Sequence, residues 1–549
     1  MKKQDKFSEQ YMDYLDGTYD SVDRIVLNAY FRIGQSPGGF RFWWRMLMGN
    51  DDKLNNSQLM RFAGRFSRRI HAYAQKNGTP LIHCQTKERK HKIAEPYFPI
   101  DPNFRGVFCI LVGKAPAPVF DIKLFENGGM DIRRKVPQPY VNYYFFHIMD
   151  PEWGHVVIRF CPHPPFNSQI ILNGHEYIAK QAEKKKIPFI KEGNCFTQVS
   201  NVPGLSHIAD TMKAKSFVGR LEQVCERWIY SACLCFALPL DEQEKTGFHY
   251  SYSVYQAEFS RNLLFTRGRV MDQIFESVID RTRAPLDIKT IRTIFGYKNR
   301  PYKKNTKGNS HKIEVVVEKL TFNMTVFKIN FGKLTVKIYS KGEHVLRIEA
   351  MAHNTDDLRC GKIIDRFPDI VIALEKILTK FLLVLRSVDI SFIDSGKLET
   401  WPLPSKVGSV RVGGLDVNKP RIRAIMDAVV ALSINPYGFT ASDLSELVGK
   451  ILKTTDYHSR QASYDLKKFR AKNLVRRIRE SHRYEATENG LRSITAFLIL
   501  RNKILIPLLA GAEKRVEKKP STNIYEIDSH YKNIQSEMQE IFNILKIAA

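Results

Sequence analysis

The sequence predicts an α+β multidomain protein in which mixed or antiparallel β-sheet core domains carry helical insertions. Three observations support this prediction. The stretches 103–199 and 313–352 repeatedly alternate apolar and polar side chains, which is the period-two pattern of β-strands. The stretch 57–78 repeats apolar residues at helical spacing. With 549 residues the chain is long enough for roughly three or four domains with cores of their own.

Residues 1–100 are expected to form an α/β region with a strongly basic helix. An aromatic segment containing Phe42, Trp43 and Trp44 suits either a base-stacking platform or a packed core, and we favour the core. The helix over residues 57–78 has apolar side chains on one face and arginines elsewhere, without acids between them, which favours contact with phosphates. The arginines concerned are Arg61, Arg65, Arg68 and Arg69.

Residues 101–200 form a β-rich domain in which histidines and acids are concentrated. Such side chains suit a divalent-metal site or general acid–base catalysis. The candidate catalytic residues are His147, Asp150, Glu152, His155, His175 and Glu176. The spacings of known metal motifs are absent, and turn or cap roles explain Asp150 and Glu152 equally well. Metal ligands are therefore left unassigned, and the cofactor is unknown, with Mg²⁺ expected only if the protein is an enzyme.

Residues 201–297 form a helical domain that is rich in tyrosine. A tyrosine nucleophile for strand transfer would need Arg and His side chains that converge on it. No such frame surrounds Tyr250, Tyr252 and Tyr255. A basic loop over residues 298–312 then marks a boundary and adds candidate nucleic-acid contacts. These are Lys303, Lys304 and Lys307.

Residues 298–395 contain a β-meander plus a helix. Within the meander, the segment KIYSKGEHVLRIE places polar side chains at alternate positions on two neighbouring strands, which suits a phosphate-binding face as well as a catalytic one. These side chains are Lys337, Tyr339, Lys341, Arg347 and Glu349. The segment resembles the Tyr-x-Lys…Arg-x-Glu strands of phage and plasmid replication initiators, although the His-hydrophobic-His metal motif of rolling-circle enzymes is absent. The chain up to this point also resembles a group of uncharacterised bacterial proteins with the same order of motifs.

Residues 421–511 follow a linker over residues 396–420 and carry the pattern with the clearest chemical meaning. An apolar helix leads into a turn with Gly438, and Thr440 then caps a second helix. A third, basic helix spans residues 459–472, and two short alternating runs and a closing helix follow. Helix, helix, basic helix, hairpin, helix is the order of a winged helix-turn-helix domain.

The stretch SYDLKKFRAKNLVRRIRESHRYEATENG resembles the matching part of MarR- and ArsR-like winged-helix domains, where a basic recognition helix likewise runs into an arginine-rich wing. This resemblance implies contact with DNA. On the third helix, Ala462, Leu466 and Phe469 form an inward stripe, and the remaining side chains can reach base edges and phosphates. The predicted contacts are Arg460, Gln461, Tyr464, Lys467, Lys468, Arg470, Arg477, Arg479 and Arg483. The alternative is a domain that only packs against a partner or dimerises.

The charge of the chain agrees with a nucleic-acid partner. The net charge is +28, from 85 Lys and Arg against 57 Asp and Glu, which favours a long polyanion as the partner.

No run of about twenty apolar residues and no apolar signal-peptide core occur, so we expect a cytoplasmic protein with no membrane partner. The eight cysteines form no C-x-x-C pair and are expected to be reduced. A tail helix over residues 512–549 has an apolar stripe that could dock on a second copy, giving a homodimer.

These patterns together predict the function. We expect a multidomain nucleic-acid-binding protein of a bacterial mobile element or ribonucleoprotein, which reads DNA through its C-terminal winged helix and leaves structured RNA open as a further partner. The alternative is a metal-dependent nuclease, or a strand-transfer or replication-initiation enzyme.

Overall fold

The computed structural model describes residues 5–85, 88–126, 129–283, 313–321, 324–331, 333–389, 395–479, 481–506 and several positions between 529 and 540. It divides into two compact units. The sheet unit comprises residues 12–271 and 317–378, and the C-terminal unit comprises residues 1–11, 272–316 and 379–549. The mixed α+β class predicted from the sequence is confirmed.

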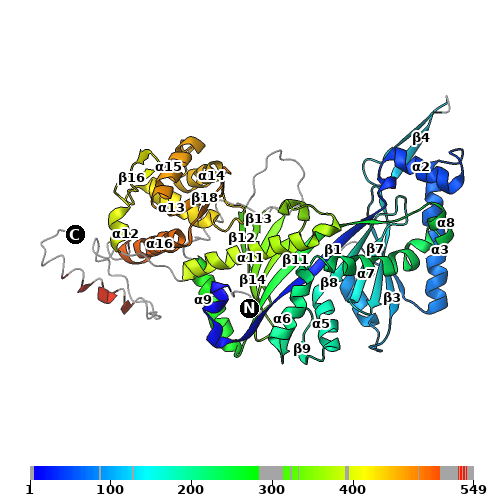
Figure 1. Cartoon of the computed structure of the whole chain (residues 1–549), viewed down its shortest axis with the longest axis horizontal. Coiled ribbons are helices and arrows are strands. Elements are labelled where there is room, and N and C mark those ends of the chain that lie inside the picture. The colour runs from blue at the N-terminus through cyan, green and yellow to red at the C-terminus, as the bar shows by residue number, and fades with distance from the viewer. Residues whose placement is uncertain are drawn as a thin grey trace, which may run out of the picture. The chain divides into compact units, whose positions relative to one another are not determined.

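An 11-stranded sheet organises the sheet unit (Figure 1). The strand order is β12-β13-β14-β15-β11-β1-β8-β7-β6-β3-β2. The bounds are β1 Leu15–Tyr30, β2 Leu81–His83, β3 Gly106–Pro116, β6 Tyr140–Asp150, β7 Gly154–Phe160, β8 Ser168–Asn173, β11 Ser251–Phe265, β12 Ile313–Thr321, β13 Met324–Phe331, β14 Leu334–Lys341 and β15 Val345–Ala352. Among the described pairings, β2 with β3 is parallel and the others are antiparallel.

The strands of this sheet come from segments that the sequence assigned to four separate domains. β1 lies in residues 1–100, β8 in 101–200, β11 in 201–297 and β15 in 298–395, yet β1 pairs with both β8 and β11, and β11 pairs with β15. The division of residues 12–378 into separate domains is therefore wrong for these strands. The reason is physical, because the alternation within a strand identifies its buried face and not its hydrogen-bonding partner.

Helices cover the sheet and contribute most of the remaining core. They are α2 Pro37–Met48, α3 Asn56–Asn77, α5 Gly174–Lys184, α6 Val202–Asp210, α7 Phe217–Ala232, α8 Leu240–Lys245 and the first part of α11 Phe367–Asp389, whose residues from 379 on belong to the C-terminal unit. The predicted helix over residues 57–78 is confirmed as α3, which begins after the cap Asn55 and ends at Gly78 with φ +63°. Its Phe66 stacks on Phe160 of β7. Trp43 is 1% exposed and Trp44 is fully buried, which confirms the core assignment of the two tryptophans, whereas Phe42 is 57% exposed.

Smaller elements complete the sheet unit. The hairpin β4–β5 consists of Phe120–Leu124 and Met130–Arg134, and the hairpin β9–β10 of Phe189–Lys191 and Phe196–Val199. The cysteines are free thiols, as expected from the sequence. In the part of the chain that the structure describes, no helix combines the length and apolar character needed to cross a membrane.

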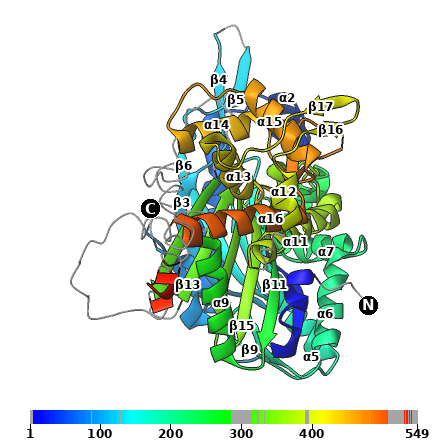
Figure 2. The ribbon, with the colours of Figure 1, turned by 90° about the vertical axis from the view of Figure 1, so that its left-hand side faces the viewer.

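The C-terminal unit follows the predicted order of elements (Figures 1 and 2). Its bounds are α12 Ser395–Thr400, β16 Ser405–Val407, β17 Val410–Val412, α13 Pro420–Leu432, α14 Ala441–Leu452, α15 Ser459–Ala471, β18 Val475–Arg477, β19 Tyr484–Ala486 and α16 Glu488–Ile499. Thr440 caps α14 in a reciprocal capping box with Asp443, as predicted for Thr440. The inward stripe of α15, Ala462, Leu466 and Phe469, is fully buried.

Candidate functional site

The structure does not bring the predicted catalytic residues into one site. His147 on β6 and His155 on β7 form a stacked pair, with 3.0 Å between Nδ1 of His147 and Nε2 of His155. Phe98 and Phe108 pack against this pair. Burial lowers the pKa of His147 to about 3, with a further contribution from His155, and lowers the pKa of His155 to about 4. Both imidazoles are neutral at pH 7, which makes them weak bases.

Asp150 has a structural role. Its Oδ1 accepts hydrogen bonds from the backbone N–H groups of Glu152 and Trp153, at 2.8 and 2.9 Å. Its Oδ2 accepts from Nη1 of Arg227 at 2.6 Å and from Nε1 of Trp228 at 2.8 Å. The carboxylate is therefore engaged on both oxygens and only 1% exposed. It closes the β6–β7 turn and ties it to α7.

The other two acidic candidates, Glu152 and Glu176, also have structural partners. Glu152 lies 3.7 Å from Arg220, and Glu176 accepts from Nζ of Lys191 at 2.6 Å. Within the described ranges, no group of three or more His, Cys, Asp or Glu side chains is placed to hold a metal ion. The residues that the sequence predicted to be catalytic therefore do not form a catalytic site in this region.

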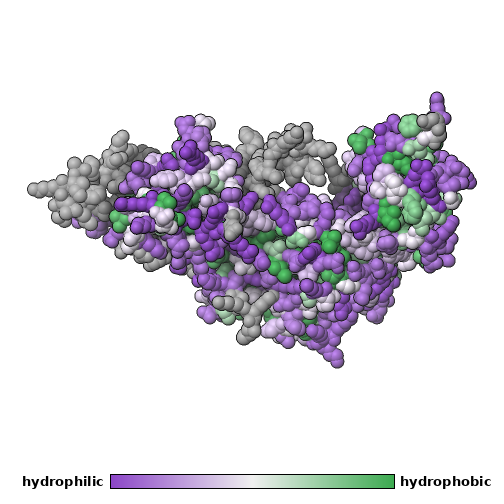
Figure 3. Space-filling view, turned by 45° about the horizontal axis from the view of Figure 1, so that its top comes forward, coloured by the Kyte–Doolittle hydropathy of each residue, from purple (hydrophilic) through white to green (hydrophobic). Residues whose placement is uncertain are grey.

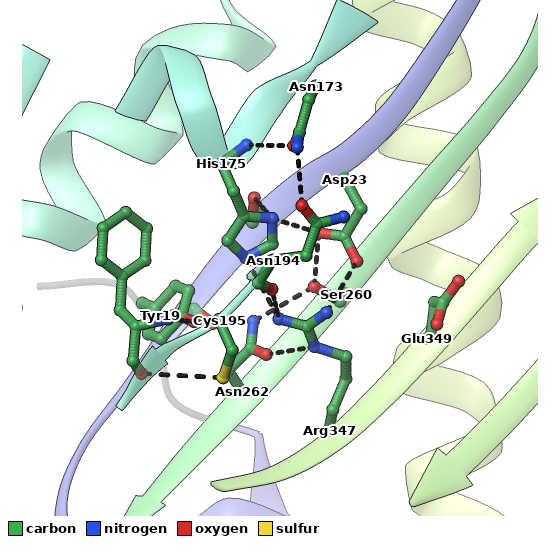
Figure 4. A network of polar contacts seen from close by, with 12 residues as sticks. Tyr19, Asp23, Asn173, His175, Asn194, Cys195, Ser260, Asn262, Arg347 and Glu349 are labelled. Carbon is green, nitrogen blue, oxygen red and sulfur yellow. Dashed lines mark hydrogen bonds and ion pairs between the residues drawn. The ribbon is translucent and has the colours of Figure 1, made fainter. Parts of the chain in front are cut away.

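His175 belongs to a buried polar network on one face of the sheet (Figure 4). Its Nδ1 lies 3.2 Å from Oδ1 of Asp23, and its Nε2 lies 3.2 Å from Nη2 of Arg347. A guanidinium only donates, so Nε2 must accept and Nδ1 must carry the proton that it donates to Asp23. Burial holds the pKa of His175 well below 6.5, and the charge of Arg347 lowers it further. The neutral ring of His175 thus links the carboxylate of Asp23 to the guanidinium of Arg347.

Arg347 is the centre of this network. Its Nε donates to Oδ1 of Asn262 at 2.7 Å, its Nη2 donates to the carbonyl of Asn194, and its Nη1 lies 3.7 Å from Oδ2 of Asp23. The hydroxyl of Ser260 donates to Oδ1 of Asp23 at 2.8 Å. Arg347 is 1% exposed and Asp23 is 3% exposed, so the charges compensate each other away from water.

Strand register explains how these residues meet. Across β11 and β15, Ser260 lies opposite Glu349 and Asn262 lies opposite Arg347. Across β14 and β15, Lys337 lies opposite Glu349 and Tyr339 lies opposite Arg347, which confirms the shared face predicted for these residues. The polar residues Asn194, Ser260 and Asn262 were not predicted from the sequence.

Asp23 and His175 reach the network through two local irregularities. The pairing of β1 with β11 shifts between Val22 and Ile25, so β1 carries a β-bulge at Asp23. At the start of α5, a Cβ on Gly174 would lie 1.7 Å from the carbonyl oxygen of Val22, so only glycine allows this close approach. Asp23 does not stand out in the sequence, because β1 also contains Asp16, Asp20, Arg24 and Asn28.

The outer part of the network carries further acids. Glu349 is 3% exposed and accepts from the hydroxyl of Tyr339 at 2.9 Å and from Nζ of Lys337 at 3.3 Å. Burial raises the pKa of Asp23 to about 6 and the pKa of Glu258 on β11 to about 7, and the charge of Glu349 raises both. This sheet face can therefore gain or lose protons near neutral pH.

The basic side chains predicted on α15 lie at its surface. Those that are exposed are Arg460, Gln461, Tyr464 and Lys467, whereas Lys468 and Arg470 are half-buried. Gln461 also serves the helix itself, because its side-chain oxygen accepts from the backbone N–H of His458 at 2.8 Å. The buried side of α15 is held by Asp465, which is 1% exposed and accepts hydrogen bonds from the guanidinium of Arg421 and from the hydroxyl of Tyr457. Sequence reasoning missed this anchor.

The arginines of the β18–β19 hairpin likewise include exposed side chains and side chains that contact the rest of the protein. Arg477 and Arg479 are exposed, and Arg477 also donates from Nε to the carbonyl of Ser481. Arg483 is half-buried and donates to the carbonyl of Gly438 at 3.2 Å, which ties the hairpin to the turn before α14. Arg476 pairs with Glu485 at 2.8 Å. The hairpin is therefore held in place by some of its arginines and presents others.

The arginine face of α3 is less available than the sequence indicated. Arg65 forms a two-bonded ion pair with Glu242, at 2.8 and 2.7 Å, and Arg69 donates to the carbonyl of Cys235. Arg61 and Arg68 are exposed. The prediction failed for Arg65 because its acidic partner lies 177 residues further along the chain. Lys303, Lys304, Lys307 and most of the predicted tail helix lie outside the described residues.

Comparisons with protein-family models, with curated proteins and with solved structures find no match for this chain. The resemblances to winged-helix repressors and to replication initiators thus stay predictions, and the function has to be argued from the side chains of the two units.

Proposed function

We propose that the protein binds duplex DNA through its C-terminal unit, with α15 in the major groove. The main support is the two-sided character of α15. Ala462, Leu466 and Phe469 are fully buried, while Arg460 and Lys467 lie at the surface. Among the described residues neither of these two cations forms an ion pair, so both remain available for phosphates or base edges.

The order of elements supports the same proposal. α13, α14 and α15 precede the β18–β19 hairpin and α16, which is the arrangement in which a helix-turn-helix places its last helix in a groove and a hairpin beside it. The net charge of +28 adds a general attraction to polyanions. Hydrophilic side chains also dominate the visible surface in Figure 3, with apolar groups in smaller areas between them.

Replacing both Arg460 and Lys467 with alanine is expected to lower the affinity for duplex DNA roughly 10–100-fold. The slope of log K against log salt should also fall by about 2, since each lost phosphate contact removes nearly one released counterion. Fluorescence-anisotropy titrations of the full chain at several salt concentrations measure both quantities. Replacing Lys184 and Lys185, two exposed lysines of the sheet unit, removes the same charge and serves as the control. Unchanged affinity and slope in the α15 variant would overturn the proposal.

Membership of a bacterial mobile element or a ribonucleoprotein is a further part of this proposal. Sequencing the nucleic acid that copurifies with the full chain tests it. A discrete RNA supports a ribonucleoprotein, whereas DNA alone supports a protein that acts on DNA only.

A second candidate function, DNA strand transfer or nicking, has one observation in its favour. Tyr339 donates to Glu349 and lies opposite Arg347, which in turn contacts His175. Tyr339, Arg347 and His175 thus belong to one polar network, in which the tyrosine is 8% exposed and burial raises its pKa. In such a reaction Glu349 takes the phenolic proton, the Tyr339 oxygen attacks the phosphorus, and the bond to one deoxyribose oxygen breaks. That oxygen takes up the proton that Glu349 accepted, and the DNA strand stays attached to Tyr339 through the new bond to phosphorus.

The strand-transfer reading predicts a covalent adduct. Full-length protein incubated with labelled DNA and Mg²⁺ or Mn²⁺ should retain label on a denaturing gel, and Tyr339→Phe should abolish this without changing DNA affinity. Tyr255→Phe, at a tyrosine that is 39% exposed on β11, is the matched control. Absence of adduct and of cleavage with the wild-type protein would rule this function out.

A further inference from the structure

Residues 401–415, which follow α12 in the C-terminal unit, contain a short hairpin that the sequence treated as part of a linker. β16 and β17 pair antiparallel, with Lys406 opposite Arg411 and Val407 opposite Val410. Gly408 occupies the first turn position with φ +60°, a conformation that side chains rarely adopt. The chain therefore forms a defined two-stranded ribbon here.

This ribbon is fixed to α15. Lys472, at the end of α15, donates from Nζ to the carbonyls of Thr400 and Leu403, each at 2.7 Å, and to the hydroxyl of Ser405 at 2.6 Å. A single ammonium group thus uses its three donors on the entry to the hairpin. Partial burial lowers the pKa of Lys472.

Apolar packing holds the other end of the hairpin. Val412 is 2% exposed and Leu415 is fully buried, and the backbone N–H of Leu415 donates to the carbonyl of Trp401 at 2.7 Å. Trp401 packs edge-on against Phe497 of α16. A Cβ on Gly414 would lie 1.8 Å from the carbonyl oxygen of Pro402, so the backbone passes too close for any larger residue. The hairpin and α15 accordingly form one rigid surface.

The charge of the hairpin has no structural explanation. Lys406 and Arg411 lie directly opposite each other and both are exposed, although like charges at opposed positions destabilise a hairpin. Residues 401–415 contain no Asp or Glu that would compensate them. A basic ribbon that is rigidly attached beside a basic helix matches the regular negative charge of a nucleic-acid backbone.

We propose that the β16–β17 hairpin is a second DNA-contacting element, in which Lys406 and Arg411 bind phosphates next to the groove occupied by α15. This inference rests on the proposed DNA binding of the C-terminal unit and adds to it a surface that lies outside α15 and the β18–β19 hairpin. The partner is duplex DNA, and the contact is to its backbone, so it contributes affinity and register without reading bases.

The test replaces Lys406 and Arg411 together with alanine in the full chain. We expect roughly tenfold weaker binding to duplex DNA and a salt slope reduced by about 2, because two phosphate contacts are lost. The melting temperature should stay equal or rise, since the variant removes a like-charge pair and leaves Lys472 and Val412 in place. A shorter protected region in hydroxyl-radical footprinting is expected as well.

Two comparisons separate this inference from the proposal on which it rests. If the hairpin variant binds like the Lys184 and Lys185 control while the Arg460 and Lys467 variant binds weakly, the hairpin inference is wrong and DNA binding by α15 stands. If both variants bind like the control, both ideas fail. If only the hairpin variant loses affinity and protection, the hairpin contact stands and the role of α15 is wrong.

Discussion

Replacing Arg347 with methionine is expected to lower the free energy of unfolding of the sheet unit by about 3–5 kcal/mol, the range for removing one partner of a buried ion pair. The guanidinium donates to Asn262, to the carbonyl of Asn194 and to Nε2 of His175. Methionine fills a similar volume but donates nothing, so these acceptors lose their donor. Asp23 also loses the cation that lies 3.7 Å from it.

Urea unfolding followed by tryptophan fluorescence measures this change. The tryptophans of the sheet unit are Trp43, Trp44, Trp153 and Trp228, so the signal reports mainly on that unit. Arg61→Met, at an exposed arginine of α3, should change stability by no more than about 0.5 kcal/mol. Adding Asp23→Asn to the Arg347→Met variant should recover part of the loss, because it removes the uncompensated charge. An unchanged midpoint in the Arg347 variant would show that the network does not stabilise the fold.

Protonation of the His147–His155 pair is expected to lower the stability of the sheet unit in acid, whereas Asp23 and Glu258, whose pKa values are raised to about 6 and about 7, act in the opposite direction in both the wild type and the variant described below. The folded pKa values of the two histidines, about 3 and about 4, lie below the value of 6.5 for an unperturbed histidine. Below pH 6.5 the unfolded chain therefore binds protons that the folded chain cannot bind. The contribution of this pair to the free energy of unfolding is fully present above pH 6.5, and it is lost as the pH falls toward the pKa values of the folded state. At pH 5 each histidine accounts for about 2 kcal/mol, or about 4 kcal/mol for the pair.

Unfolding curves measured between pH 8 and pH 5 test this expectation. Replacing both histidines with glutamine removes the titration and keeps side chains that can hydrogen-bond to each other. The double variant should lose about 4 kcal/mol less than the wild type over this interval. Between pH 8 and pH 7 both proteins should change alike, which provides an internal control. Equal losses in both proteins down to pH 5 would mean that the buried pair does not govern acid stability.

Local features of the fold were predictable from the sequence because neighbouring residues determine them. The apolar spacing of α3 and α15, the cap at Thr440 and the alternation of the strands all depend on residues within one or two turns. The same holds for the shared face of Lys337 and Glu349, since β14 and β15 are joined by a short turn.

Contacts between distant segments were decided only by the tertiary structure. Asp23, His175 and Arg347 come from three parts of the chain and meet because β1 lies between β8 and β11, and β11 lies next to β15. No strand's own pattern specifies its neighbour, so the sequence identified two of these residues without their partners and missed Asp23. The ion pair of Arg65 with Glu242 was missed for the same reason.

The sequence by itself thus predicted α3, the C-terminal helices, the exposed Arg460 and Lys467 of α15 and the positive charge that suits a polyanion, but it missed the strand β11 in its predicted helical domain and the β16–β17 hairpin in its predicted linker. Only the tertiary structure decided that His147 and His155 form a neutral pair, that Asp150 is engaged on both oxygens, and that Lys472 holds a basic hairpin against α15. The physical reason is that burial and pairing set the chemistry of a titratable group, and both depend on residues far away in the chain.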